Sequence, residues 1–319
     1  MRRFVLPALL LPTLATAPAL VPGAFPQTGP DPPVFSTVVD MVKITVTVLD
    51  GSGKPVTGLD PSDFTILEDG RPQSIELFAR SYEPGEDETL EVDLGLLMDT
   101  SESMIDVLGE TRMAATRFLE AVPRASELLT VFFDHDIRLS RYDSEHQQGL
   151  IRRIQEAEGG GNTALYDAIT VYLSRVYGSG GRQVMVLFSD GEDSVSEVSM
   201  GETLEMVRAS NVTIYPIAFS ANVSQFKRAF TSMAFLRQLA EVTGGEIFMP
   251  MGTRTLPEIY TRIIEQLEAQ YVIGFVSDGA LDESGFRKLE VRLSRGELEV
   301  RHRKGYYPLV PPGAVAPSD

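Results

Sequence analysis

The order of apolar and polar residues predicts a β-rich segment ahead of the central part of the chain. Between Val42 and Val48 every second residue is apolar, which is the pattern of a strand with one buried face. Residues 63–78 contain two further strand-like runs around Asp69-Gly70, a dipeptide typical of tight hairpins. Residues 34–82 are therefore predicted to form the N-terminal part of a small all-β domain.

From residue 92 the pattern changes to apolar runs that alternate with amphipathic helical segments. The apolar runs lie at 92–99, 127–133, 183–189, 212–219 and 245–249, and helices are predicted near 105–122, 145–157, 164–177, 200–210, 232–243 and 256–270. This alternation predicts an α/β fold with a doubly wound, mostly parallel sheet and helices on both faces. The run 137–142 follows the previous one too closely for a crossover, so we expect an antiparallel edge strand with His135 in its turn.

After Gln270 the chain returns to strand-like runs, at 270–278, 286–294 and 297–307. Neither flank has enough strands for a stable sandwich alone. We therefore predict one discontinuous, sandwich-like β-domain, built from 34–82 and 271–308, into which an α/β domain of residues 92–270 is inserted. Residues 83–91 are interpreted as an acidic linker and 309–319 as a tail.

The first 24 residues are typical of a secretory signal peptide, with a retained signal anchor as the alternative. Arg2 and Arg3 precede an apolar run that ends in alternating small residues, and Pro7 and Pro12 interrupt that run. The chain has no cysteine, so it has no lipobox. We expect a secreted or periplasmic protein without a membrane span in its mature form, beginning with a Pro-rich tail at 25–33.

Composition and charge indicate which classes of partner and of metal site are not expected. The formal net charge is −17 at pH 7, and Lys and Arg do not cluster with aromatic residues, so nucleic acid and anionic lipid surfaces are not expected partners. The absence of cysteine excludes thiolate metal sites, and three histidines far apart in sequence do not favour a zinc cluster.

Three predicted loops carry oxygen-bearing side chains. Two of these loops directly follow predicted strands, and the third directly precedes a predicted helix. Because ligands of open α/β sheets bind beyond the carboxyl ends of the strands, we expect these side chains to meet. The candidate metal ligands are Asp99, Ser101, Ser103, Thr163 and Asp190. Two carboxylates and three hydroxyls suit a hard cation, best Mg²⁺ and otherwise Mn²⁺ or Ca²⁺. Such a set leaves the ion positive, so a carboxylate from outside can complete it.

The motifs D-T-S-E-S at 99–103, N-T-A-L at 162–165 and S-D-G at 189–191 resemble a von Willebrand factor type A domain with a metal-ion-dependent adhesion site. The resemblance covers about residues 90–270 and implies that the two serines and the threonine contact the metal, while the aspartates act through water. V-T-G-L-x-x-x-D-F, E-D-G-x-P-Q and R-K-G-Y-Y in the flanks are similar to a bacterial secreted subgroup frequent in acidobacteria. Glu102, where many members have Gly, adds a charge beside the site.

The resulting hypothesis is an exported, non-enzymatic module in which the bound cation captures an Asp or Glu side chain of a protein partner; the oligomeric state stays open. One alternative is an architectural envelope protein whose loops only cap helices. Another is a metal-dependent hydrolase, although G-x-S-x-G, H-E-x-x-H and a Walker lysine are missing. The resemblance also suggests that the helix 256–270 could shift when the metal gains its ligand, which would act on the β-domain at Tyr271.

Overall fold

The computed structural model describes residues 41–80, 92–122, 125–142, 146–176, 181–219, 226–250, 252–277 and 285–308. The predicted signal peptide, Pro-rich tail, acidic linker and C-terminal tail lie outside these residues.

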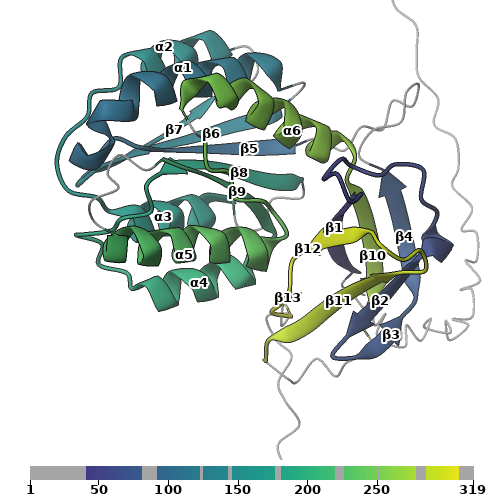
Figure 1. The fold of residues 1–319 in the computed structure, drawn as a ribbon. Coiled ribbons are helices and arrows are strands. Elements are labelled where there is room, and N and C mark those ends of the chain that lie inside the picture. Colours follow the sequence, from purple (N-terminus) through teal and green to yellow (C-terminus); the bar gives the residue numbers. More distant parts are fainter. Residues whose placement is uncertain are drawn as a thin grey trace, which may run out of the picture. The chain divides into compact units, whose positions relative to one another are not determined.

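The central part of the chain folds around a five-stranded sheet (Figure 1). Its strands are β5 (Val92–Asp99), β6 (Ala125–Phe133), β7 (Ile137–Tyr142), β8 (Arg182–Ser189) and β9 (Val212–Ala218). The spatial order is β7-β6-β5-β8-β9, and all neighbours are parallel except β6 and β7. The predicted fold class is therefore confirmed, including the antiparallel edge strand.

Helices cover both faces of this sheet, because strands that carry apolar side chains on both faces must be buried on both. The helices are α1 (Ile105–Ala121), α2 (Gln147–Gln155), α3 (Leu165–Val176), α4 (Met200–Ala209), α5 (Phe226–Thr243) and α6 (Leu256–Glu268). Figure 1 shows α1, α2 and α6 on one face and α3, α4 and α5 on the other. Each face has its own apolar core, with Phe118 and Ile263 in the first and Tyr172 and Leu236 in the second.

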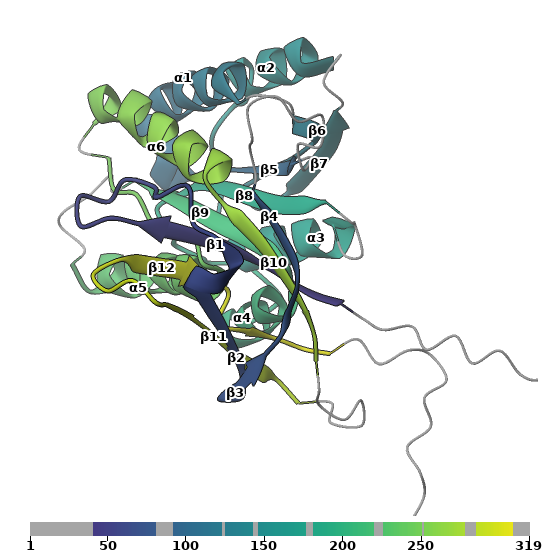
Figure 2. The same cartoon turned by 90° about the vertical axis from the view of Figure 1, so that its right-hand side faces the viewer.

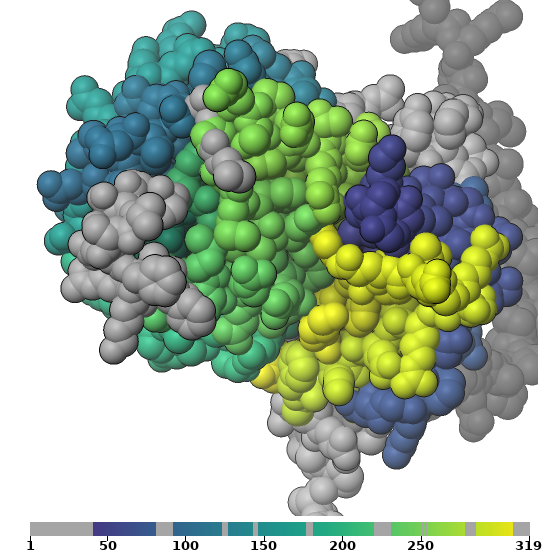
Figure 3. All heavy atoms as spheres, viewed as in Figure 1, coloured from purple at the N-terminus to yellow at the C-terminus, as the bar shows by residue number. Residues whose placement is uncertain are grey.

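Two antiparallel sheets form the β-domain, and each combines strands from both ends of the chain (Figure 2). Figure 3 shows atoms from the two ends, coloured purple and yellow, side by side on the surface. The first has the order β12-β1-β10-β4, with β1 (Met41–Leu49), β4 (Ile75–Arg80), β10 (Tyr271–Val276) and β12 (Glu299–His302). The second has the order β13-β11-β2-β3, with β2 (Phe64–Glu68), β3 (Arg71–Gln73), β11 (Arg287–Leu293) and β13 (Gly305–Tyr306). Ile44, Ile66, Phe275 and Leu289 meet in one core, as a sandwich-like domain requires.

Three short 3₁₀ turns complete the described elements: η1 (Pro61–Asp63), η2 (Glu102–Met104) and η4 (Thr253–Thr255). Two details differ from the sequence-based expectation. Residues 245–249 form only a single bridge, in which Phe248 pairs with Ile217 of β9, and not a strand. The helix α5 begins six residues before the predicted start, because Lys227 and Arg228 interrupt the apolar pattern on which the prediction relied.

The strand order determines which loops can meet. The chain passes from β5 to β6 on one side and returns to place β8 on the other side of β5. Met98 pairs with Phe188, so the residues after both strands lie next to each other at this switch point. At the opposite end of the sheet, Arg182 donates hydrogen bonds to the carbonyl of Leu267 and to Gln270, where α6 leads into the β-domain.

Candidate functional site

Asp99 is the last residue of β5, and its side chain is fully buried. Its Oδ1 accepts a hydrogen bond from the backbone N–H of Ser101 at 3.0 Å. Its Oδ2 accepts one from the hydroxyl of Ser189 at 2.7 Å. Both carboxylate oxygens are thus held in fixed positions by the ends of two neighbouring strands.

The electrostatic environment of Asp99 is unfavourable for a negative charge. Burial raises its pKa to about 7, and the charge of Asp190 adds to the rise, although hydrogen bonds from Ser101 and Ser189 oppose it. Among the residues that the structure describes, no Lys, Arg or His forms an ion pair with Asp99 or Asp190. Within the described residues, these two carboxyl groups therefore have no cationic side chain to balance them.

The two serines lie beside each other in the loop after β5. The hydroxyl oxygens of Ser101 and Ser103 are 3.2 Å apart, with Ser101 buried and Ser103 half-buried. The alternation of D-x-S-x-S explains the arrangement, because the turn η2 that follows brings residues 101 and 103 to the same side. Glu102, between them, is exposed.

The Gly-rich loop before α3 closes over the serine loop. Gly160 donates its N–H to the carbonyl of Thr100 at 2.8 Å, and Glu102 donates its N–H to the carbonyl of Gly161 at 3.0 Å. These bonds bring Thr163, which is buried, to the same edge of the sheet.

The loop after β8 is tied to Thr163 in turn. The N–H of Thr163 donates to the hydroxyl of Ser194 at 3.0 Å, and its carbonyl accepts from the N–H groups of Ser194 and Val195. In the same loop, Asp190 accepts a hydrogen bond from the N–H of Glu192 at 3.0 Å. All three predicted loops are therefore neighbours.

Gly191 enables the turn that presents Asp190. Its φ is +79°, and a Cβ at this position would lie 2.7 Å from the carbonyl oxygen of Ser232 in α5. Its N–H donates to the hydroxyl of Ser189, the same hydroxyl that donates to Asp99. Only glycine combines this backbone conformation with such close packing.

Several polar residues support the site without having been predicted as its metal ligands. Ser189 links Asp99 to the β8 loop, and Ser194 links Thr163 to it. Asp193 accepts hydrogen bonds from the N–H of Tyr166 and the hydroxyl of Ser196, so this acidic residue is part of the loop framework. For Ser189, the available signal was its place in the S-D-G motif at the end of an apolar run.

The turn between β6 and β7 contains a second group of possible ligands: Asp134, His135 and Asp136. Burial would raise the pKa of Asp134, but hydrogen bonds and charge from Arg138 lower it below its ordinary value. Arg138 already neutralises this carboxylate at 2.7 Å and also donates to the hydroxyl of Thr100. The group is an ion-paired turn that braces the Asp99 loop.

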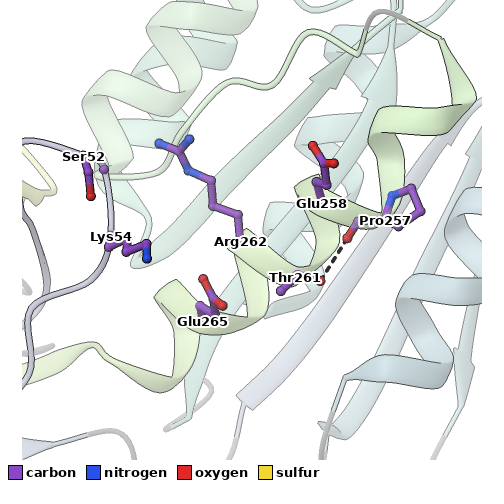
Figure 4. Close-up of a pocket in the computed structure, with 8 residues that line it drawn as sticks. Ser52, Lys54, Pro257, Glu258, Thr261, Arg262 and Glu265 are labelled. Atoms are coloured by element: carbon purple, nitrogen blue, oxygen red, sulfur yellow. Dashed lines mark hydrogen bonds between the residues drawn. The ribbon is translucent and has the colours of Figure 1, made fainter.

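The described residues border several hollows, of which two are relevant here. One, of about 360 Å³, lies between the loop that follows β1 and α6. Figure 4 shows Arg262 extending from α6 toward the loop that bears Ser52, with Lys54 opposite the same helix. Glu258 and Glu265 also line it, so it favours neither sign of ligand charge. The other, of about 560 Å³, is bordered by Gly159 and Gly160 beside the serine loop.

The residues at the switch point fit a divalent cation. They supply oxygen donors only, which is the preference of hard cations, and a cation would remove the cost of ionising a buried carboxylate beside another one.

The described part of the chain has no helix that is both long and apolar enough to span a membrane.

Comparison with known proteins gives a family match. The sequence model described as von Willebrand factor type A domain matches residues 93–262, more than half of the chain. No curated protein matches the chain significantly in sequence.

Solved structures give distant matches. A von Willebrand factor type A protein from Catenulispora acidiphila is 12% identical with a TM-score of 0.45, over 83% of this chain and 72% of that chain. Proximal thread matrix protein 1 from the mussel byssus, in a structure with a zinc-occupied MIDAS motif, is 15% identical with a TM-score of 0.43, over 57% of this chain and 46% of that chain. The pilus adhesin SpaC from Lactobacillus rhamnosus GG is 9% identical with a TM-score of 0.49, over 79% and 48%. This chain spans just under half of the byssus protein, and TM-scores below 0.5 carry no argument about function.

Proposed function

Because the chain belongs to the von Willebrand factor type A domain family, we propose that it is a metal-dependent protein-binding module. Its metal centre holds a divalent cation, best Mg²⁺, and the cation captures an Asp or Glu side chain of a partner protein. The proposed ligands, bound directly or through water, are Asp99, Ser101, Ser103, Thr163 and Asp190.

One observation carries this proposal most directly. Asp99 is buried, its pKa is raised to about 7, and the charge of Asp190 contributes to the rise. A carboxylate pair of this kind is costly unless a cation joins it. The adjacent hydroxyls of Ser101 and Ser103 add neutral donors, so the set supplies only two negative charges.

The electrostatic balance explains why an acidic partner can bind to an acidic protein. A divalent ion held by two carboxylates and neutral hydroxyls is not over-neutralised, so it attracts a further carboxylate. The net charge of −17 would otherwise repel such a partner. The bound metal therefore allows a surface that would repel acidic groups to bind one carboxylate of the partner.

We propose a binding role and not an enzymatic one. The sequence lacks the motifs G-x-S-x-G and H-E-x-x-H, and no Walker lysine follows the Gly-rich loop. Export to the periplasm or beyond rests on residues 1–24, and the bacterial secreted subgroup rests on the flanking motifs; both stay predictions.

Calorimetric titration with Mg²⁺ tests the metal centre. We expect the wild-type protein to take up one Mg²⁺ per chain and Asp99→Asn to take up none, because the buried carboxylate is lost. Asp136→Asn is the matched control, since it removes an acid from the other ligand group and should leave the uptake unchanged. Loss of uptake in Asp136→Asn, or normal uptake in Asp99→Asn, would place the metal elsewhere.

Capture of a carboxylate is tested separately. The probe is the peptide acetyl-Gly-Gly-Glu-Gly-Gly-amide, with the same peptide carrying Gln in place of Glu as its control. We expect NMR titration to detect binding of the Glu peptide in Mg²⁺, and none in EDTA or with the Gln peptide. Normal Mg²⁺ uptake without any difference between the two peptides would reject capture and leave a structural metal.

A further inference from the structure

Two of the large apolar side chains that the described residues expose belong to residues close to proposed metal ligands. The exposed ones are Met41, Ile105, Met113, Val195, Met200, Met249 and Phe286. Ile105 is 49% exposed and Val195 is 41% exposed. Exposed apolar residues are ordinary when scattered. However, Ile105 is two residues from Ser103, and Val195 is hydrogen-bonded to Thr163.

Ile105 has a fixed position beside the serine pair. It is the first residue of α1 and follows Met104, which is fully buried and anchors the turn. On the other side, its Cγ1 lies 3.3 Å from the point that a Cβ on Gly159 would occupy. The side chain therefore lies close to the Gly-rich loop while about half of it stays exposed.

Val195 has the same relation to Thr163. Its backbone N–H donates to the carbonyl of Thr163 at 3.2 Å, and the preceding Ser194 accepts from the N–H of Thr163. The two residues thus neighbour the proposed metal centre from different elements, Ile105 at the start of α1 and Val195 in the loop after β8. They form what we call the apolar rim, consisting of Ile105 and Val195.

The negative charge of the protein limits which further contacts a partner can make around the metal. Away from the metal, further acidic groups of the partner meet a protein of net charge −17 and are repelled. A single solvent-exposed contact between a carboxylate and a cation gives limited affinity. The remaining affinity usually comes from apolar contacts around the polar centre, as in the cores of protein interfaces.

We propose that the partner segment presents its Asp or Glu next to an aliphatic side chain, and that the apolar rim binds this side chain. The inference rests on the proposed function, because the acidic residue reaches the metal. The rim then selects among the many acidic segments that a bare metal would accept equally.

The cavity of about 560 Å³ offers the competing possibility of a second carboxylate. Arg153 lies over the ring of Phe132 there, with its guanidinium carbon 5.8 Å from the centroid, and has no ion pair within the described residues. Glu156 and Glu158 line the same cavity, so its local charge does not favour an acid. Binding at Arg153 is therefore an outcome for the experiment to exclude.

Three peptides separate these possibilities in the presence of Mg²⁺: acetyl-Gly-Leu-Glu-Leu-Gly-amide, acetyl-Gly-Gly-Glu-Gly-Gly-amide and acetyl-Gly-Glu-Glu-Glu-Gly-amide. We expect the leucine peptide to bind about tenfold tighter than the glycine peptide, as partial burial of one leucine implies. Ile105→Ser and Val195→Ser should each reduce this ratio. Met113→Ser, on the exposed side of the same helix, is the matched control and should preserve it.

The contrary outcomes are distinct. Equal affinities for the leucine and glycine peptides, or a ratio that survives both rim substitutions, overturn the inference while leaving metal-dependent capture intact. Tightest binding of the triple-Glu peptide, lost in Arg153→Gln, overturns it in favour of the cavity. Absence of binding by all three peptides despite normal Mg²⁺ uptake rejects the proposed function itself.

Discussion

At the scale of single residues, the sequence was sufficient to select the candidate ligands but not their supports. Asp99, the serine pair, Thr163 and Asp190 follow from motifs and from their places at strand ends. The hydrogen bond from Ser189 to Asp99 joins residues 90 positions apart. It depends on the register of two strands, which a single sequence does not specify.

Asp99 leads to a prediction about pH in the metal-free protein. Its pKa is raised from 3.8 to about 7. A group with a raised folded pKa contributes its full stability below the unfolded value, and this contribution is lost as the pH rises through the folded value. In EDTA, Asp99→Asn should therefore unfold like wild type at about pH 4 and be more stable at about pH 8, by on the order of a few kcal/mol.

Urea unfolding across this range gives the measurement. The buried His302, whose pKa is lowered to about 4 by its burial, favours the opposite trend below its unfolded value, but it is common to both proteins and cancels in their difference. Glu102→Gln is the control, because Glu102 neighbours the site and is exposed. If the difference in unfolding free energy between Asp99→Asn and wild type does not grow with pH, the carboxyl group of Asp99 does not have a raised pKa in the metal-free protein.

At the scale of elements, long periodic segments were predictable and short ones were not. The helices α1, α3 and α6 begin within one residue of their predicted starts, since their apolar faces repeat over several turns. The run 245–249 looks like a strand in sequence, yet it forms one bridge. A Cβ on Gly245 would lie 2.0 Å from the carbonyl oxygen of Ile214, a close approach that no periodicity reveals.

The β8–α4 connection gives the prediction at this scale. Gly191→Ala should lower the free energy of unfolding by about 2 kcal/mol or more, because the left-handed backbone and the contact with Ser232 both resist a Cβ. It should also weaken Mg²⁺ uptake by displacing Asp190. Gly109→Ala is matched to it: Gly109 is inside α1 with open space around it, so alanine should stabilise by about 0.5–1 kcal/mol.

Urea unfolding and calorimetric Mg²⁺ titration measure both variants. If Gly191→Ala keeps the stability and the Mg²⁺ affinity of wild type, the turn is not constrained as described. A loss of stability with unchanged Mg²⁺ affinity would separate the fold of the loop from the placement of Asp190.

At the scale of the whole molecule, the pairing of strands from the two ends of the chain was predictable from strand counting, because neither flank has enough strands for a sandwich alone. The contacts that join the two domains were not predictable. Gln270, at the end of α6, donates to the hydroxyls of Tyr215 and Thr47, which belong to different domains. Such polar pairs carry no sequence signal. That a ligand at the metal shifts α6 and thereby the β-domain stays a prediction.

Glu246 is the clearest link between the domains. Its Oε2 accepts hydrogen bonds from Gln266 of α6 and Arg301 of β12, both at 2.6 Å, and its Oε1 lies 2.7 Å from Arg262 of α6. Its side chain is 14% exposed and that of Arg301 is 18% exposed, so this ion pair is largely shielded from water, whereas Arg262 is 40% exposed. Removing the charge would leave two arginines without their shared carboxylate.

We therefore expect Glu246→Gln to lower the free energy of unfolding by about 1–3 kcal/mol. Glu299→Gln removes the other carboxylate that contacts Arg301, but this one is 55% exposed, so its loss should cost less than about 1 kcal/mol. A double-mutant cycle of Glu246→Gln with Arg301→Met measures the coupling between the domains. A coupling near zero would mean that water screens the pair and that β12 is held to the α/β domain by other contacts, such as the hydrogen bond from Lys304 to Val242.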